Sequence, residues 1–178
     1  MNISTLLPDY VLDHHSDIDS LLVGVLFSSY QIVFLILAPI LGDFLPRIGR
    51  RRAVFTGIIL ITCSTAIFAC GALFSSGVTF YWVSLIARGF QGGADALILI
   101  SIPSIISVEW PEENEIYQGY AGMSMGIGLM FGPVIASVLI RYLDYFWTLM
   151  TFAMLIFVLG MSALCYIPKR IDLDETKK

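Results

Sequence analysis

A stripe of polar side chains interrupts the long apolar run of residues 81–102. It consists of Arg88, Gln91, Gly92 and Asp95, whose spacing places all four on one face of a helix. A guanidinium keeps its proton in a protein, so at mid-membrane depth it costs at least ~2.5 kcal/mol. Such charges are tolerated mainly where they line a polar cavity or an ion path. The stripe therefore predicts a coupling site, and the alternative is that the two charges only fix helix packing.

Arg88 and Asp95 are too far apart along this helix to form a simple direct pair. Two helical turns separate them, which is about 10 Å of rise. Each charge therefore needs a partner from another helix, from water or from a ligand. Asp95 is a candidate proton or cation site, because a buried carboxyl can exchange protons. Gln91, together with Tyr30 and Gln31 of an earlier apolar run, is expected to line the same path.

The composition is that of a membrane protein. Of the 178 residues, 57% are hydrophobic and 13% are charged, and the mean hydropathy is +0.84. Soluble domains carry roughly 25% charged residues. A chain with half that share cannot cover a water-facing surface, so the lipid bilayer is its expected solvent. The net charge of −4 and the absence of a basic patch argue against a nucleic-acid partner.

The sequence contains no catalytic, metal-binding or cofactor-binding constellation. The three cysteines lie in apolar runs without ligand spacing. Residues 122–126 match the letters of a nucleophile elbow, but they fall within a predicted helix and have no histidine nearby. We therefore expect no enzyme activity, no metal and no cofactor.

Five apolar stretches are long enough to cross a bilayer as helices, which takes about 20 residues each. The predicted spans are 21–41, 53–74, 80–102, 117–140 and 145–167. None shows the two-residue alternation of a barrel strand. The predicted fold is an all-α membrane protein, with residues 21–167 forming a polytopic bundle of transmembrane helices.

Basic residues gather on one side of this predicted bundle. Those between the first two spans are Arg47, Arg50, Arg51 and Arg52. The tail 168–178 carries four more on the same side, and Arg141 stands alone on the other. The positive-inside rule places the arginine connection and the C-terminus in the cytoplasm. Residues 1–20 then face the cell exterior or an organelle lumen, in a plasma or vesicle membrane.

The fourth predicted span is rich in small residues. Two sets follow the small-xxx-small spacing that lets helix backbones approach closely: Gly122/Gly126 and Gly128/Gly132/Ala136. Pro133 removes one backbone donor and is expected to bend the helix. Packing alone is the alternative reading of this pattern.

Three motifs together resemble the major facilitator superfamily. Residues 42–52 are similar to the signature connection between family helices 2 and 3, with Gly42, Arg47, Gly49, Arg50 and Arg51 aligned. Pro46 takes the usual aspartate position and Asp43 stands three residues earlier. Residues 88–92, Arg-Gly-Phe-Gln-Gly, match the helix 4 motif, whose arginine is associated with proton coupling. Residues 128–133, with Gly128, Gly132 and Pro133, match the helix 5 motif typical of antiporters.

The resemblance implies family helices 2 to 6, and residues 6–10 would follow a missing helix 1. It is closest to the drug:proton antiporter branch that includes the vesicular amine transporters. In those, a helix 2 lysine follows a Phe-Ala-Ser triplet, whereas Tyr30 follows Phe-Ser-Ser here, so a monoamine substrate is not implied. The expected function is proton-coupled antiport of a small organic solute by a truncated N-terminal half. Its partners would be substrate, protons and a missing C-terminal or partner half. The alternative is a non-transporting membrane protein, such as a degenerate half-transporter, a sensor or a partner subunit.

Overall fold

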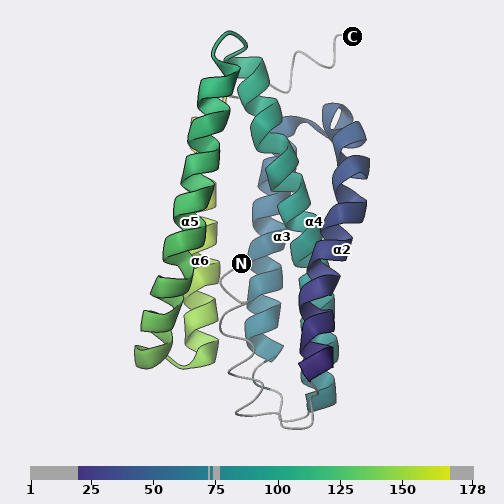
Figure 1. Ribbon diagram of the computed structural model, residues 1–178, viewed down its shortest axis with the longest axis vertical. Helices are drawn as coiled ribbons and strands as arrows, with labels where there is room; N and C mark the ends of the chain where they lie inside the picture. Colours follow the sequence, from purple (N-terminus) through teal and green to yellow (C-terminus); the bar gives the residue numbers. More distant parts are fainter. Residues whose placement is uncertain (1–19, 72, 74–76, 169–178) are drawn as a thin grey trace.

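The computed structural model describes residues 20–71, 73 and 77–168 as an all-α bundle (Figure 1). Its helices are α2 (Ser20–Ile48), α3 (Arg50–Gly71), α4 (Gly77–Glu109), α5 (Asn114–Tyr142) and α6 (Tyr145–Tyr166). All five are long and apolar enough to cross a membrane, which confirms the predicted fold class. Most of the N-terminal segment 1–20 and of the tail 168–178 lies outside the described residues.

These apolar segments form helices because, in lipid, the backbone N–H and C=O groups of each segment must find hydrogen-bond partners within that segment. The helices also extend beyond most of the predicted spans, since backbone hydrogen bonding does not stop where the apolar run stops. At the end of α2, residues 42–48 are helical rather than loop, and α4 likewise continues through residues 103–109. Gly49 alone separates α2 from α3, with a φ of 91° that favours glycine.

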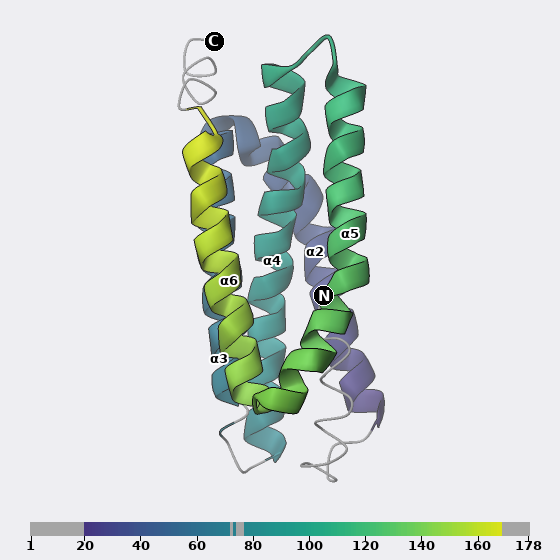
Figure 2. The same ribbon diagram turned by 90° about the vertical axis from the view of Figure 1, so that its left-hand side faces the viewer.

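The helices alternate in direction, so the α2–α3 turn, the α4–α5 connection and the end of α6 lie at one end of the bundle (Figure 1). α4 packs against α2 and α3, and α3 also packs against α6. α5 makes few contacts with the other helices, and its last part turns toward the start of α6 (Figure 2). Pro133 lies inside α5, and its missing backbone donor accounts for a bend there.

A glycine lies at each of the three tight helix interfaces. A Cβ at Gly57 of α3 would come within 2.7 Å of Ile98 of α4, and one at Gly160 of α6 within 2.8 Å of Ile58 of α3. The third, Gly92, lies between α4 and α2. Close backbone approach through small residues is the main source of helix association in lipid. The bundle is further filled at the end opposite the α2–α3 turn by the fully buried side chains of Phe68, Phe80, Leu26 and Leu149.

Candidate functional site

A hydrogen bond between Tyr30 and Asp95 joins α2 to α4. The Tyr30 hydroxyl donates to Oδ2 of Asp95 over 2.6 Å, and both side chains are half-buried. Asp95 therefore has a partner on another helix, as its separation from Arg88 predicted. A short bond from a hydroxyl to a carboxyl oxygen is among the stronger hydrogen bonds in proteins, so it holds the carboxyl group in a defined place between the two helices.

Gly92 brings α2 close enough for that bond to form. A Cβ at this position would lie 2.6 Å from the carbonyl oxygen of Tyr30 and 3.3 Å from the backbone nitrogen of Phe34. Real side-chain carbons do not approach a backbone oxygen so closely. The absence of a side chain at Gly92 therefore sets the spacing of α2 and α4 one turn away from Asp95.

Arg88 is buried inside the bundle, with a side chain that is only 3% exposed. Its guanidinium lies 5.3 Å from the ring centres of both Phe27 on α2 and Phe68 on α3. Its Nη1 donates to Oε1 of Gln91 over 3.4 Å, a long bond between two members of the predicted stripe. Two cation–π contacts partly compensate for the removal of the charge from water.

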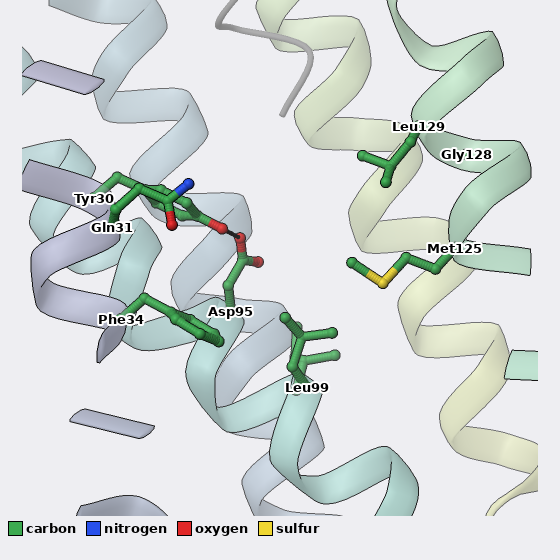
Figure 3. Close-up of a pocket in the computed structure, with 9 residues that line it drawn as sticks. Tyr30, Gln31, Phe34, Asp95, Leu99, Met125, Gly128 and Leu129 are labelled. Carbon is green, nitrogen blue, oxygen red and sulfur yellow. Dashed lines mark hydrogen bonds between the residues drawn. The ribbon is translucent and has the colours of Figure 1, made fainter. Parts of the chain in front are cut away.

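An open cavity of about 520 Å³ lies between α2, α4 and α5. Figure 3 shows Tyr30, Gln31 and Phe34 on one side, Asp95 in the middle with Leu99 below it, and Met125 and Leu129 reaching in from α5. The volume falls in the range of about 300–1,000 Å³ typical of small-molecule sites. Asp95 supplies the carboxyl group among the described lining residues, and most of that wall is aromatic or apolar.

The structure brings together part of the predicted set. Asp95, Tyr30, Gln31 and Gly128 all line the cavity, although they come from three helices. Arg88 and Gln91 do not line it, and both are buried between helices. The sequence reasoning missed lining residues one turn away from the predicted ones: Phe34, Ile98, Leu99, Met125 and Leu129. Helical spacing of i+3 or i+4 from Tyr30 and Asp95 would have found the first three.

A sequence model of the Major Facilitator Superfamily matches residues 1–178. The chain belongs to the Major Facilitator Superfamily. Facilitator-superfamily membership and the five apolar helices together make it a multi-pass integral membrane protein.

Relatives of this superfamily member include vesicular transporters named for acetylcholine and for amines, and a tetracycline resistance protein. The vesicular acetylcholine transporter of Drosophila melanogaster is 32% identical over 132 residues, covering 73% of this chain and 21% of that protein. The human synaptic vesicular amine transporter is 31% identical over 158 residues, which cover 87% of this chain and 29% of that protein. The class E tetracycline resistance protein of Escherichia coli is 29% identical over 114 residues, which cover 64% of this chain and 26% of that protein. The chain thus spans less than a third of each relative, and no solved structure matches it significantly.

The superfamily-like arginine motif lies at the α2–α3 turn, away from the cavity. Nε of Arg50 donates to Oγ of Ser104 on α4 over 2.6 Å. Nη2 of Arg51 donates to the carbonyl oxygen of Leu164 on α6 over 3.4 Å. The two arginines thereby connect α3 to α4 and to α6 by hydrogen bonds at this end of the bundle. Among the remaining motif residues, the guanidinium of Arg47 lies over the Phe44 ring. Gly42 and the exposed Asp43 lie within α2, and Gly49 forms the turn to α3.

The glycines of the superfamily-like helix 5 motif divide into two groups. Gly132 is buried together with Ala136, four residues later in α5. By contrast, nothing in the described structure lies within 4 Å of a Cβ placed at Gly122, Gly126 or Gly128. The close packing expected of the small-residue sets therefore appears at the Gly132 end of α5 and not at the end nearer the cavity.

Proposed function

We propose that this chain forms part of a transporter that moves a small organic solute across a membrane by alternating access, in exchange for protons. The observation that carries the proposal is the cavity between α2, α4 and α5, where an acidic group lies against an aromatic and apolar wall. Family membership supports the same function, as do relatives named as a vesicular amine transporter and a multidrug efflux pump. These properties point to a transporter rather than an enzyme.

The cavity suits an organic cation better than an organic anion. The Asp95 carboxyl supplies negative charge, and none of the described residues that line the cavity is an arginine, lysine or histidine. The rings of Tyr30 and Phe34 offer faces that attract a cation, and the thioether of Met125 adds an adaptable apolar contact. Drug-sized cations combine one positive charge with an apolar body, which matches this lining. Relatives named for acetylcholine and amines agree with this class of solute.

Exchange follows if a proton and the solute compete for Asp95. A carboxyl group can hold a proton or face a bound cation, but the favourable charge pairing with the cation is lost once the proton is bound. Binding of one therefore favours release of the other, which couples their movements in opposite directions. Arg88 and Gln91 complete the coupling stripe on α4, because a fixed charge near Asp95 influences which form of the carboxyl is favoured.

The remaining motifs would serve the change between outward-facing and inward-facing states. Alternating access requires a second bundle against which this one rocks, so a C-terminal or partner half is the expected partner. The arginine turn would act at the cytoplasmic gate, with the N-terminal side facing the exterior or lumen. Gly132 would allow close packing of α5, and Pro133 its bending, while the cavity opens and closes.

Uptake of tetraphenylphosphonium into proteoliposomes containing the full-length protein tests this proposal. This permanent organic cation carries no exchangeable proton, so a pH gradient cannot concentrate it by changing its own ionisation. Because the cation is lipophilic and follows a membrane potential, the potential is held at zero, and accumulation driven by the imposed pH gradient then reports coupling. We expect accumulation by the wild type and a loss of at least about ten-fold in Asp95→Asn, because a charge-assisted contact contributes about 1.5–3 kcal/mol.

The matched control is Asp144→Asn, which removes an exposed carboxylate that makes no side-chain cap at the start of α6. This variant should transport like the wild type. Equal accumulation by Asp95→Asn and the wild type, or proton-driven uptake that is unaffected by Arg88→Ala and Asp95→Asn alike, would contradict the coupling assignment.

A further inference from the structure

Arg88 has hydrogen-bond donors that the described residues do not satisfy. Its Nε and Nη2 are buried and have no acceptor within hydrogen-bonding distance, and Nη1 has only the long bond to Gln91. The rings of Phe27 and Phe68 attract the charge but accept no conventional hydrogen bond from these nitrogens. A buried guanidinium with open donors is costly unless something accepts from them.

Hydroxyl groups lie on the same side of the bundle as these donors. Ser84 precedes Arg88 by one turn on the same face of α4, is fully buried, and its Oγ has no hydrogen-bond partner in the described structure. Long helical side chains lean toward the N-terminus of their helix, which directs the Arg88 side chain toward Ser84. The Tyr145 side chain, at the start of α6, is buried as well.

No hydrogen bond joins the Arg88 guanidinium to a carboxylate among the described residues. The sequences of α3 and α6 contain no aspartate or glutamate, and α2 contains only Asp43, at its opposite end. Asp95 is the acidic residue of this part of α4, but it lies two helical turns from Arg88 and accepts the hydrogen bond of Tyr30. Within the described structure, the Arg88 charge therefore has no hydrogen-bonded counter-charge.

We infer that Arg88 and Ser84 form a binding site for a small inorganic anion, of which chloride is the obvious physiological candidate. Chloride has no hydrogens, so it can accept from several donors at once and needs no acceptor in return. A water molecule could also accept from two of these donors and donate to the Ser84 hydroxyl, but it carries no charge. An anion also balances the guanidinium charge, which water does not. This site is separate from the cavity at Asp95 and does not depend on the transport proposal.

Thermal unfolding of the purified full-length protein in chloride and in gluconate tests this inference. The two salts are exchanged at constant ionic strength, so that general screening stays the same. We expect a saturable rise in melting temperature as chloride replaces gluconate, because a ligand that binds the folded state stabilises it. Line broadening in chlorine NMR, reversed by removal of the protein, measures binding independently.

Three variants locate the site. Arg88→Gln should abolish the saturable shift. Ser84→Ala keeps the charge and the fold and should weaken chloride affinity about five-fold, the effect of losing one neutral hydrogen bond. Arg141→Gln, which removes an exposed arginine at the end of α5, should leave the shift unchanged.

Identical melting curves in chloride and gluconate would overturn the inference, and would indicate water or a group from outside this chain as the acceptor. An unchanged chloride affinity in Ser84→Ala would also overturn it, and that variant decides the matter if Arg88→Gln does not fold.

Discussion

Replacing Gly92 by alanine should separate α2 from α4 and loosen the Tyr30–Asp95 pair. The new methyl carbon would lie 2.6 Å from the carbonyl oxygen of Tyr30, and a tolerable contact of 3.0–3.4 Å needs a displacement of 0.4–0.8 Å. The contact is with backbone, so a side-chain rotation of the neighbour cannot relieve it. The same displacement would lengthen the 2.6 Å bond from Tyr30 to Asp95 toward the outer limit of hydrogen-bond geometry.

The expected effect is a balance of two terms. Overpacking costs about 1–3 kcal/mol, whereas alanine gains up to about 1 kcal/mol over glycine within a helix. Gly92→Ala should therefore melt at a lower temperature than the wild type. It should also bind tetraphenylphosphonium more weakly, by up to about ten-fold, because 1.4 kcal/mol corresponds to a factor of ten in affinity. Differential scanning fluorimetry and equilibrium binding measure the two effects on the same preparation.

Gly89→Ala is the matched control, since it lies three residues earlier in α4 and has nothing within 4 Å of its Cβ position. It makes the same chemical change without the backbone contact, so its melting temperature should stay the same or rise slightly. If Gly92→Ala melts and binds like Gly89→Ala, close approach at Gly92 is not what positions Tyr30, and this part of the account is refuted.

Three further variants probe the site and the bundle. Tyr30→Phe removes the hydroxyl that donates to Asp95 and should weaken tetraphenylphosphonium binding measurably while the melting temperature falls little; unchanged affinity would argue against a role for the pair. Gly49→Ala forces a side chain onto the φ of 91° at the α2–α3 turn and should destabilise by about 1 kcal/mol or more, whereas Gly42→Ala, with open space around it, should not. Leu149→Ala creates a cavity at a fully buried position and should cost about 2–5 kcal/mol; the exposed Leu155→Ala is its control, and equal melting of the two would refute the packing described.

The fold class and the membrane spans could be predicted from the sequence because they depend on the composition of long segments. The exact ends of the helices could not, because they depend on local turns and tertiary contacts. Apolar runs identify helices because the bilayer sets their length, so the fold class and the five spans found among the described residues could be predicted. The helical state of residues 42–48 could not, since it depends on a terminating turn at Gly49 whose φ no composition reveals.

Part of the candidate site could be predicted from the sequence, because helical spacing shows which residues share one face of a helix. Helical spacing placed Arg88, Gln91 and Asp95 on one face, and the structure shows how differently those side chains are used. Asp95 lines a cavity with Tyr30, whereas Arg88 is enclosed by the rings of Phe27 and Phe68. Periodicity within a helix says which residues share a face, but it does not say which other helix that face meets.

Proton release on solute binding tests the central claim most directly, namely that a proton and an organic cation compete for Asp95. Tetraphenylphosphonium is added to the purified full-length protein in weakly buffered solution, and the pH is followed. The account predicts that binding by the wild type releases protons and that Asp95→Asn releases none. Proton release by Asp95→Asn equal to that of the wild type, or tight binding by the wild type with no release at any pH at which the protein is stable, would contradict it.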